Sequence, residues 1–275
     1  MRVAVVGHVE WVEFAHVQHV PAPGEIVHAS GSWQAAAGGG AVAAVQLARL
    51  AGECLFLTAL GDDELGRLAA SELEALGVRV EAVWRDEPQR RAFVHVDAAA
   101  ERTITVIGER MGPQGGDRLP WTELEGADGV YFTAGDADAV RKARAGKTLV
   151  ATTRASDALV PAHAEIDMLV CSASDSGERF GARELDPAPR FVAETEGAAG
   201  GWLSGRDGTS RRWAAAPLPG PAGDAYGAGD SFAAGVTFGL ASGLSAEEAV
   251  ALGARCGAAC MTGRGPYEAR LDLSS

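Results

Sequence analysis

The sequence predicts an α/β protein with a mostly parallel central sheet, helices on both faces of that sheet, and a small β-sheet beside it. Short apolar runs alternate with helix-compatible stretches along most of the chain, which is typical of parallel sheets. The first run, residues 3–6, is apolar throughout and ends at Gly7, as expected of a strand buried on both faces. Residues 91–97 and 102–107 instead alternate apolar and polar side chains, which predicts an antiparallel hairpin.

Length, charge and composition limit the class of protein and its partners. The 275 residues suffice for one large domain, and the formal net charge of −13 argues against a nucleic-acid partner, because such binding depends on clustered Lys and Arg. No stretch reaches the ~18 apolar residues of a membrane span. The N-terminal residues lack a signal-peptide pattern, and the four cysteines lack metal-ligand spacing. We therefore expect a cytoplasmic protein that binds small molecules.

The elements of the N-terminal half follow the same alternation, with strands expected at residues 53–60 and 78–83 and a helix at 64–76. Asp62 or Asp63 is the expected N-cap of that helix, and Gly77 ends it. Two further segments, residues 12–34 and 90–108, lie outside the alternation. The first contains a turn-rich stretch at 21–32 that suggests a hairpin outside the main sheet, so we expect both segments to form a lid over a site.

Gly38, Gly39 and Gly40 open an earlier helix of Ala, Val and Leu that Gly52 ends. Bare backbone at a helix N-terminus suits a hydroxylated or anionic ligand. A triple glycine also makes a tight turn that lets a helix pack closely on a sheet, and both interpretations stay open. Glu10 follows the first strand at the sheet edge where ligands of open α/β proteins bind, so its carboxylate is a candidate to hold a substrate hydroxyl; the alternative is a solvated side chain.

The C-terminal half continues the strand–helix alternation. The expected strands are 129–133, 148–152, 167–171 and 191–195, the expected helices are 137–145, 156–163, 231–242 and 246–262, and a hairpin is expected at 202–203 and 210–214. Ser245 and Glu248 form a capping-box pattern at the start of the last helix.

The stretch 223–235, GDAYGAGDSFAAG, carries the clearest chemical signal. Gly227, Ala228 and Gly229 place backbone with little or no side chain before the carboxylate of Asp230, and a helix follows. Amides at a helix start can hold a transferring phosphoryl group while the carboxylate takes a proton from a hydroxyl. The alternative is that Asp230 caps the helix and does nothing more.

Several stretches together resemble the ribokinase-like sugar kinases of the PfkB family. Residues 223–235 resemble that family's DTTGAGDSF-x-x-G signature, and residues 35–52 resemble its glycine-rich helix start. LTALGDDELGRLAASELEALGV resembles the family's GxxGxDxxG…LxxxGV segment, and TEGAAG at 195–200 resembles its TxGxxG turn. The order and spacing match over nearly the whole chain, which implies a single ribokinase-like domain over residues 1–275 with the lid described above.

The resemblance implies an ATP-dependent phosphotransferase that moves the γ-phosphate to a hydroxyl of a small molecule, a sugar or a nucleoside. It implies that Asp230 is the base and that Gly227, Ala228 and Gly229 form the anion hole. Thr195, Gly197 and Gly200 are expected to contact ATP, whereas Gly38, Gly39 and Gly40 face the acceptor. Mg²⁺ is expected to bridge the phosphates. The family also suggests a homodimer formed through the lid.

This chain departs from the family pattern at the acceptor end. Val42 stands where a substrate-binding asparagine is expected, and Val12 stands near the position of a substrate aspartate, which leaves Glu10 or Glu13 as its replacement. Asp224 is followed by Ala225 and Tyr226 in place of two threonines. These losses keep open the alternative of a non-catalytic ligand-binding relative.

The metal-associated NxxE element has no clear copy in this chain. One alignment places it on Ser172 and Asp175, and the other places it on Asp175 and Glu178, the pair we predict as metal ligands. Arg154, at the position of a family arginine, and Arg110, just past the lid hairpin, could each pair with an anionic substrate. The alternatives are a structural role for Arg154 and a surface charge for Arg110. A Rossmann oxidoreductase is disfavoured because no GxGxxG follows the first strand.

Overall fold

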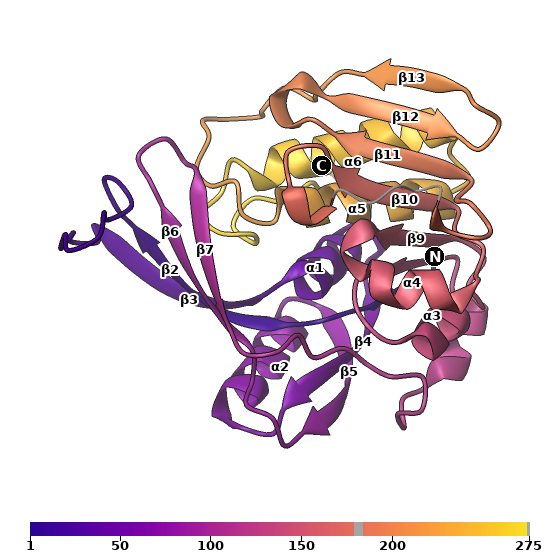
Figure 1. Cartoon of the computed structure of the whole chain (residues 1–275), viewed down its shortest axis with the longest axis horizontal. Coiled ribbons are helices and arrows are strands. Elements are labelled where there is room, and N and C mark those ends of the chain that lie inside the picture. Colours follow the sequence, from indigo (N-terminus) through magenta and orange to yellow (C-terminus); the bar gives the residue numbers. More distant parts are fainter. Residues whose placement is uncertain (179–183, 274–275) are drawn as a thin grey trace.

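A mostly parallel nine-stranded sheet forms the centre of the molecule in the computed structural model, which describes residues 1–178 and 184–273 (Figure 1). Its strand order is β13-β12-β11-β10-β9-β8-β1-β4-β5, and only the β11–β12 and β12–β13 pairs in this described part are antiparallel. The strands are β1 (Val3–Val6), β4 (Cys54–Gly61), β5 (Val78–Arg85), β8 (Gly129–Phe132), β9 (Leu149–Thr152), β10 (Met168–Ser172), β11 (Phe191–Thr195), β12 (Gly201–Gly205) and β13 (Ser210–Trp213).

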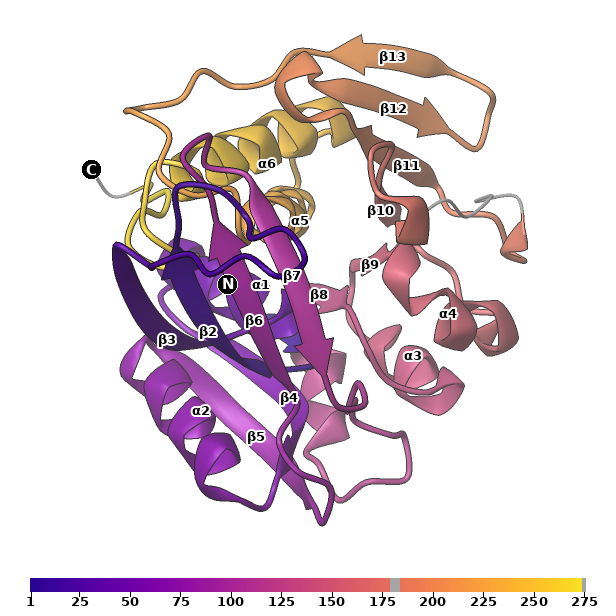
Figure 2. The ribbon, with the colours of Figure 1, turned by 60° about the vertical axis from the view of Figure 1, so that its left-hand side comes forward.

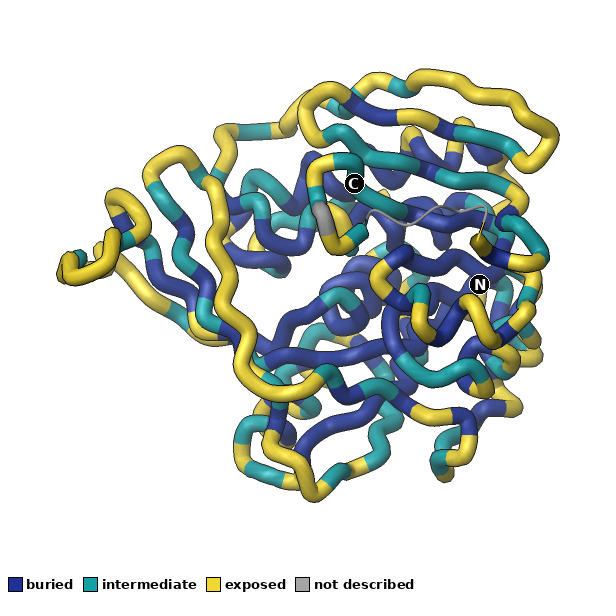
Figure 3. The backbone as a smooth tube through the Cα atoms, in the orientation of Figure 1, coloured by how far each residue is buried: buried dark blue, intermediate teal, exposed yellow. Residues whose placement is uncertain are grey.

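Helices cover both faces of this sheet, as the alternation predicts. The helices are α1 (Gly39–Ala51), α2 (Glu64–Ala75), α3 (Ala137–Ala143), α4 (Ser156–Ala162), α5 (Ala228–Ala241) and α6 (Ala246–Cys260). Residues of α1, α2, α5 and α6 share one apolar core with the sheet, and residues of α3 and α4 share a second core on the other face. Figure 3 shows the strands at the centre of the sheet in dark blue, as buried residues between the two layers of helices.

A second, four-stranded sheet projects beside the main one in the order β3-β2-β6-β7 (Figure 2). It consists of β2 (Glu10–His16), β3 (Gly31–Ala37), β6 (Arg91–Val96) and β7 (Arg102–Ile107). The β2 and β6 strands are parallel, and the other pairs are antiparallel. The strands of the first hairpin lie largely on either side of the turn-rich stretch 21–32, and only the first two residues of β3 fall within it, which corrects the expected position. On β7, the side chains of Ile104, Val106 and Ile107 are exposed, and dimerisation through the lid stays a prediction.

Local signals set several helix boundaries. Asp63, rather than Asp62, caps α2, because its side chain accepts a hydrogen bond from the Gly66 N–H at 2.9 Å. The capping box of Ser245 and Glu248 is present at the start of α6. None of the helices in the described residues is long and apolar enough to cross a membrane.

Candidate active site

The glycine-rich start of α1 lies against Asp230 of α5, although the two are far apart in sequence. A methyl group added to Gly39 would lie 2.7 Å from Oδ1 of Asp230. One added to Gly38 would lie 3.1 Å from the backbone nitrogen of Glu10, and one added to Gly40 would lie 2.7 Å from the carbonyl oxygen of His8. Because these glycines have no side chains, the start of α1, the Asp230 carboxylate of α5 and the segment that holds Glu10 can meet at the carboxyl end of β1.

The N-cap of α5 is Gly227, not Asp230, which corrects the capping interpretation. Gly227 adopts a left-handed conformation with φ 82°, and Ala228 is the first helical residue. Asp230 lies in the first turn, where the N–H groups of Ala228, Gly229 and Asp230 have no partner within the helix. Gly229 is exposed, and a methyl group added there would meet nothing within 4 Å. The backbone is thus accessible at the positive end of the helix dipole.

The carboxyl group of Asp230 is half-buried and has a perturbed pKa. Burial raises the pKa of Asp230 to about 6, and the negative charge of Glu178 acts in the same direction. The positive charges of Arg154, Arg102 and Arg110 oppose this rise. Such a carboxylate is a better proton acceptor than an exposed aspartate and is still ionised near neutral pH.

Glu10 is buried and already paired, so it is not the solvated side chain of the alternative interpretation. Arg90 donates from Nε to Oε1 of Glu10 at 2.6 Å, and Nε2 of His8 lies 3.8 Å from the same oxygen. Burial and three nearby arginines hold the pKa of His8 well below its usual value, so this imidazole is neutral. Glu13, the other candidate, is exposed on β2.

The predicted nucleotide-binding residues lie farther along the carboxyl edge of the sheet, at the turn between β11 and β12. The Thr195 hydroxyl donates to the carbonyl of Cys171 at 3.2 Å. Gly197 and Gly200 have φ values of 57° and 86°, which residues with side chains rarely adopt. A methyl group on Gly200 would also lie 2.1 Å from the carbonyl oxygen of Trp213. Glycine is therefore structurally required at Gly200, whatever it binds.

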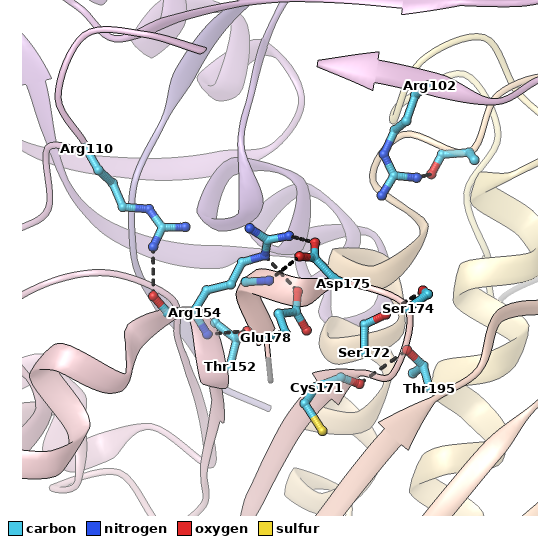
Figure 4. A network of polar contacts seen from close by, with 12 residues as sticks. Arg102, Arg110, Thr152, Arg154, Cys171, Ser172, Ser174, Asp175, Glu178 and Thr195 are labelled. Carbon is cyan, nitrogen blue, oxygen red and sulfur yellow. Dashed lines mark hydrogen bonds and ion pairs between the residues drawn. The ribbon is translucent and has the colours of Figure 1, made fainter. Parts of the chain in front are cut away.

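Asp175 and Glu178, the predicted metal ligands, both bind Arg154 (Figure 4). Arg154 Nε donates to Oε1 of Glu178 at 2.7 Å, and Nη2 contacts Oδ2 of Asp175. Within residues 1–178 and 184–273, no group of three or more His, Cys, Asp or Glu side chains could hold a metal ion. The oxygens suit Mg²⁺ in type, but the guanidinium already satisfies the pair, so this arrangement does not fit a preformed metal site. Their role as metal ligands stays a prediction.

Two further arginines, one in the lid and one just past it, also reach this region. Arg102 of β7 donates to the carbonyl of Ala225 at 2.9 Å and so ties the lid to the loop before α5. Arg110 donates from Nη1 to the carbonyl of Arg154 at 3.0 Å, whereas its Nε is buried without a hydrogen-bond partner. Arg110 is therefore part of the site and not a free surface charge.

Sequence reasoning missed three residues that the fold brings into the site: His8, Arg90 and Tyr226. The Tyr226 hydroxyl accepts a hydrogen bond from the Gly38 N–H at 3.2 Å and thereby joins the loop before α5 to the start of α1. The position of Tyr226 inside the stretch GDAYGAGD could have indicated that it lies at the site. His8 and Arg90 gave no such indication, because only the pairing of β2 with β6 brings Arg90 to Glu10.

Replacement of Gly39 by Ala is expected to lower turnover about 10- to 100-fold without unfolding the protein. The added methyl group must displace the flexible Asp230 carboxylate from its position 2.7 Å away, and misplacing a reacting group by about 1 Å can cost that much. Steady-state rates and thermal unfolding of Gly39→Ala test this. Gly116→Ala is the matched control, because its methyl group meets nothing within 4 Å. Equal rates in both variants would contradict a close approach of Asp230 to the reacting atoms.

The mostly parallel nine-stranded sheet and the four-stranded lid sheet beside it place the chain in the ribokinase-like class of α/β folds. A sequence profile described as "pfkB family carbohydrate kinase" matches residues 1–162 and 139–272. The chain therefore belongs to the PfkB family of carbohydrate kinases, as the sequence motifs indicated.

Individual relatives agree with this assignment. The chain is 32% identical over 142 residues to an ATP-dependent ribose-1-phosphate kinase of Halopiger xanaduensis, a match that spans 49% of this chain and 46% of the relative. The alignment thus covers about half of that relative's length. Ribokinase from Thermotoga maritima superposes with a TM-score of 0.80 at 20% identity, covering 100% of this chain and 97% of the other. A nucleoside kinase from Methanocaldococcus jannaschii has a TM-score of 0.73 at 15% identity, covering 100% and 96%. These structural matches show the common fold.

Proposed function

We propose that this protein transfers the γ-phosphate of ATP to a hydroxyl group of a sugar or nucleoside. The observation that carries this proposal is the meeting of the Asp230 carboxylate with the open N-terminus of α5 and the glycine-rich start of α1. Membership of a carbohydrate kinase family supports it. The names of a ribose-1-phosphate kinase and a nucleoside kinase among its relatives support the two acceptor classes.

In this proposal Asp230 accepts the proton of the acceptor hydroxyl, whose oxygen forms a bond to the γ-phosphorus while the bond to the β,γ-bridging oxygen breaks. The products are ADP and a phosphate ester. The N–H groups of Ala228 and Gly229, at the start of α5, hold the negative charge of the moving phosphoryl group. Gly38, Gly39 and Gly40 let the acceptor approach the backbone closely. Thr195, Gly197 and Gly200 contact the nucleotide.

ATP would bring Mg²⁺ with its phosphates, which neutralises their charge. Since Arg154 occupies Asp175 and Glu178, no step of the reaction is assigned to a metal held by that pair. Arg154 itself adds positive charge near Asp230 and lowers the pKa of this base.

The test is ADP release from Mg-ATP in the presence of sugars, nucleosides and phosphorylated sugars, with mass spectrometry of the product. ADP release that depends on an acceptor, with a mass gain of one phosphate on that acceptor, supports the proposal. The alternative, a ligand-binding relative without catalysis, draws on the loss of polar residues at Val12 and Val42. Saturable binding of a sugar without ADP release from any acceptor would favour that alternative.

The rate is expected to depend on pH through Asp230. Its raised pKa of about 6 means that the catalytically useful, ionised form is lost as the pH falls below about 6. We expect kcat/KM to be constant above about pH 7 and to fall tenfold per pH unit below 6, reaching about one hundredth of the plateau at pH 4. Initial rates in buffers of constant ionic strength test this, after checking that the protein stays folded. A profile that is flat between pH 5 and 8 would exclude Asp230 as the base.

A further inference from the structure

The positions at which the family pattern places polar residues for the acceptor are apolar or already engaged in this chain. Val12 of β2 and Val42 of α1 are buried in the apolar core of the lid sheet, together with the ring of Tyr226. The Tyr226 hydroxyl accepts a hydrogen bond from the start of α1, and the carboxylate of Glu10 is paired with Arg90. The valines offer no hydrogen bond to a hydroxylated acceptor, so another side chain must supply one.

The imidazole ring of His8, just past β1, lies against the glycine-rich start of α1. A methyl group added to Gly38 would lie 3.3 Å from Cδ2 of His8, and one added to Gly39 would lie 3.5 Å from Cε1. Nε2 is the ring atom between these two carbons, so the Nε2 edge of the ring faces Gly38 and Gly39. The methyl group on Gly39 would also lie 2.7 Å from Oδ1 of Asp230. His8 and the proposed base therefore border the same glycine, where the acceptor approaches in the proposed reaction.

The polar atoms of His8 are poorly satisfied by the protein itself. Nδ1 lies 3.5 Å from the hydroxyl oxygen of Thr133, which is a long hydrogen bond. Nε2 lies 3.8 Å from Oε1 of Glu10, which is too far for a hydrogen bond, and no other described residue forms one with it. The side chain is only 5% exposed, and buried polar groups nearly always have a partner, because an unpaired one costs stability. A neutral imidazole with a nitrogen unpaired at this place is suited to bind a ligand.

We propose that Nε2 of His8 binds a hydroxyl group of the acceptor next to the one that Asp230 deprotonates, so that His8 selects acceptors with adjacent hydroxyl groups. Because both side chains border Gly39, two hydroxyl groups on neighbouring carbons of a sugar ring reach both at once. A hydroxyl group both donates and accepts hydrogen bonds, so it satisfies Nε2 in either tautomer of the neutral ring. This inference rests on the proposed kinase function and adds to it the residue that determines specificity for the acceptor.

The test uses acceptors that differ by one hydroxyl group: ribose with 2-deoxyribose, and adenosine with 2′-deoxyadenosine and 3′-deoxyadenosine. In the wild-type chain, loss of the hydroxyl that His8 contacts should lower kcat/KM for ADP release about 10-fold, because Nε2 is then left unpaired. In His8→Leu the same loss should change kcat/KM less than about twofold, and the KM for ATP should stay within about twofold of the wild-type value. His8→Gln keeps a hydrogen-bonding group and should retain most of the discrimination, which keeps the test valid if Leu impairs folding.

His16→Leu is the matched control, because His16 lies at the other end of β2, where its ring contacts Trp33 with centroids 5.0 Å apart. This variant should discriminate between the acceptors as the wild type does. If His8→Leu discriminates as strongly as the wild type in every pair, the inference is overturned while the kinase proposal stands. Calorimetric titration with the same acceptors in the absence of ATP tests His8 by itself. Weaker binding of one deoxy acceptor to the wild type but not to His8→Leu, with no ADP release from any acceptor, would support the role of His8 and reject the kinase function. Neither binding nor turnover in both series would overturn both proposals.

Discussion

Replacement of Asp230 by Asn is expected to reduce kcat by about 10²- to 10⁴-fold, the range of general base catalysis, with nucleotide affinity changed by less than about threefold. The amide has nearly the same shape as the carboxylate but does not accept the proton of the hydroxyl. It also leaves the backbone N–H groups at the start of α5 in place. ADP release and nucleotide titration measure the two quantities separately. Asp138→Asn, in the first turn of α3, is the matched control for losing a carboxylate at a helix start.

The same substitution is expected to stabilise the fold at neutral pH. A carboxyl group whose folded pKa is about 6 and whose ordinary value is 3.8 binds protons more tightly in the folded state, so its ionisation costs stability. This cost is absent below about pH 4 and complete above about pH 6. Because solvent still reaches the side chain, we expect a gain of about 1–2 kcal/mol in Asp230→Asn at pH 7.

Denaturant unfolding of both proteins at pH 7 and pH 4 checks this, and the two stabilities should converge at the lower pH. Loss of activity together with increased stability would identify Asp230 as a residue kept for function. A variant that is inactive because it is less stable at pH 7 would contradict the assignment.

Replacement of Arg90 by Met is expected to lower the free energy of unfolding by about 3 kcal/mol, because it leaves the buried Glu10 carboxylate without its charged partner. The side chains of Arg90 and Glu10 are 16% and 10% exposed, so water compensates little of this loss. Urea unfolding at pH 7 measures the change. Arg206→Met is the control: Arg206 pairs with Glu165 at 3.5 Å on the surface, and we expect its loss to cost less than about 1 kcal/mol.

The double variant Glu10→Leu/Arg90→Met removes both charges and should recover most of the stability lost in Arg90→Met. Such recovery would show that the cost arises from the unpaired carboxylate and not from lost packing of the arginine stem. If Arg90→Met and Arg206→Met destabilise the protein equally, the Glu10–Arg90 pair is no more important than a surface ion pair.

The sequence by itself determined the fold class and predicted the glycine-rich helix start before Asp230, which we propose holds the transferring phosphoryl group. Both follow from local patterns: apolar runs such as Val3–Val6 predict buried parallel strands, and the small residues before Asp230 expose backbone at a helix start. Glycine positions were informative for the same reason, since the contacts of Gly39 and Gly40 depend on the absence of a side chain.

Only the tertiary structure decided which side chains are available to a ligand. Glu10 is a polar residue at the predicted sheet edge, yet Arg90, which lies directly before β6 and 80 residues further along the chain, occupies its carboxylate. Arg154 likewise occupies Asp175 and Glu178, and Tyr226 fills the space beside Val42 with an aromatic ring. These pairings join residues that are distant in sequence. The sequence of a carboxylate or an arginine is the same whether the folded protein pairs it or leaves it free, so the sequence alone does not reveal these pairings. Charge balance around Asp230 is therefore a property of the folded protein: the sequence predicted its carboxylate, and the surrounding arginines and burial set its pKa.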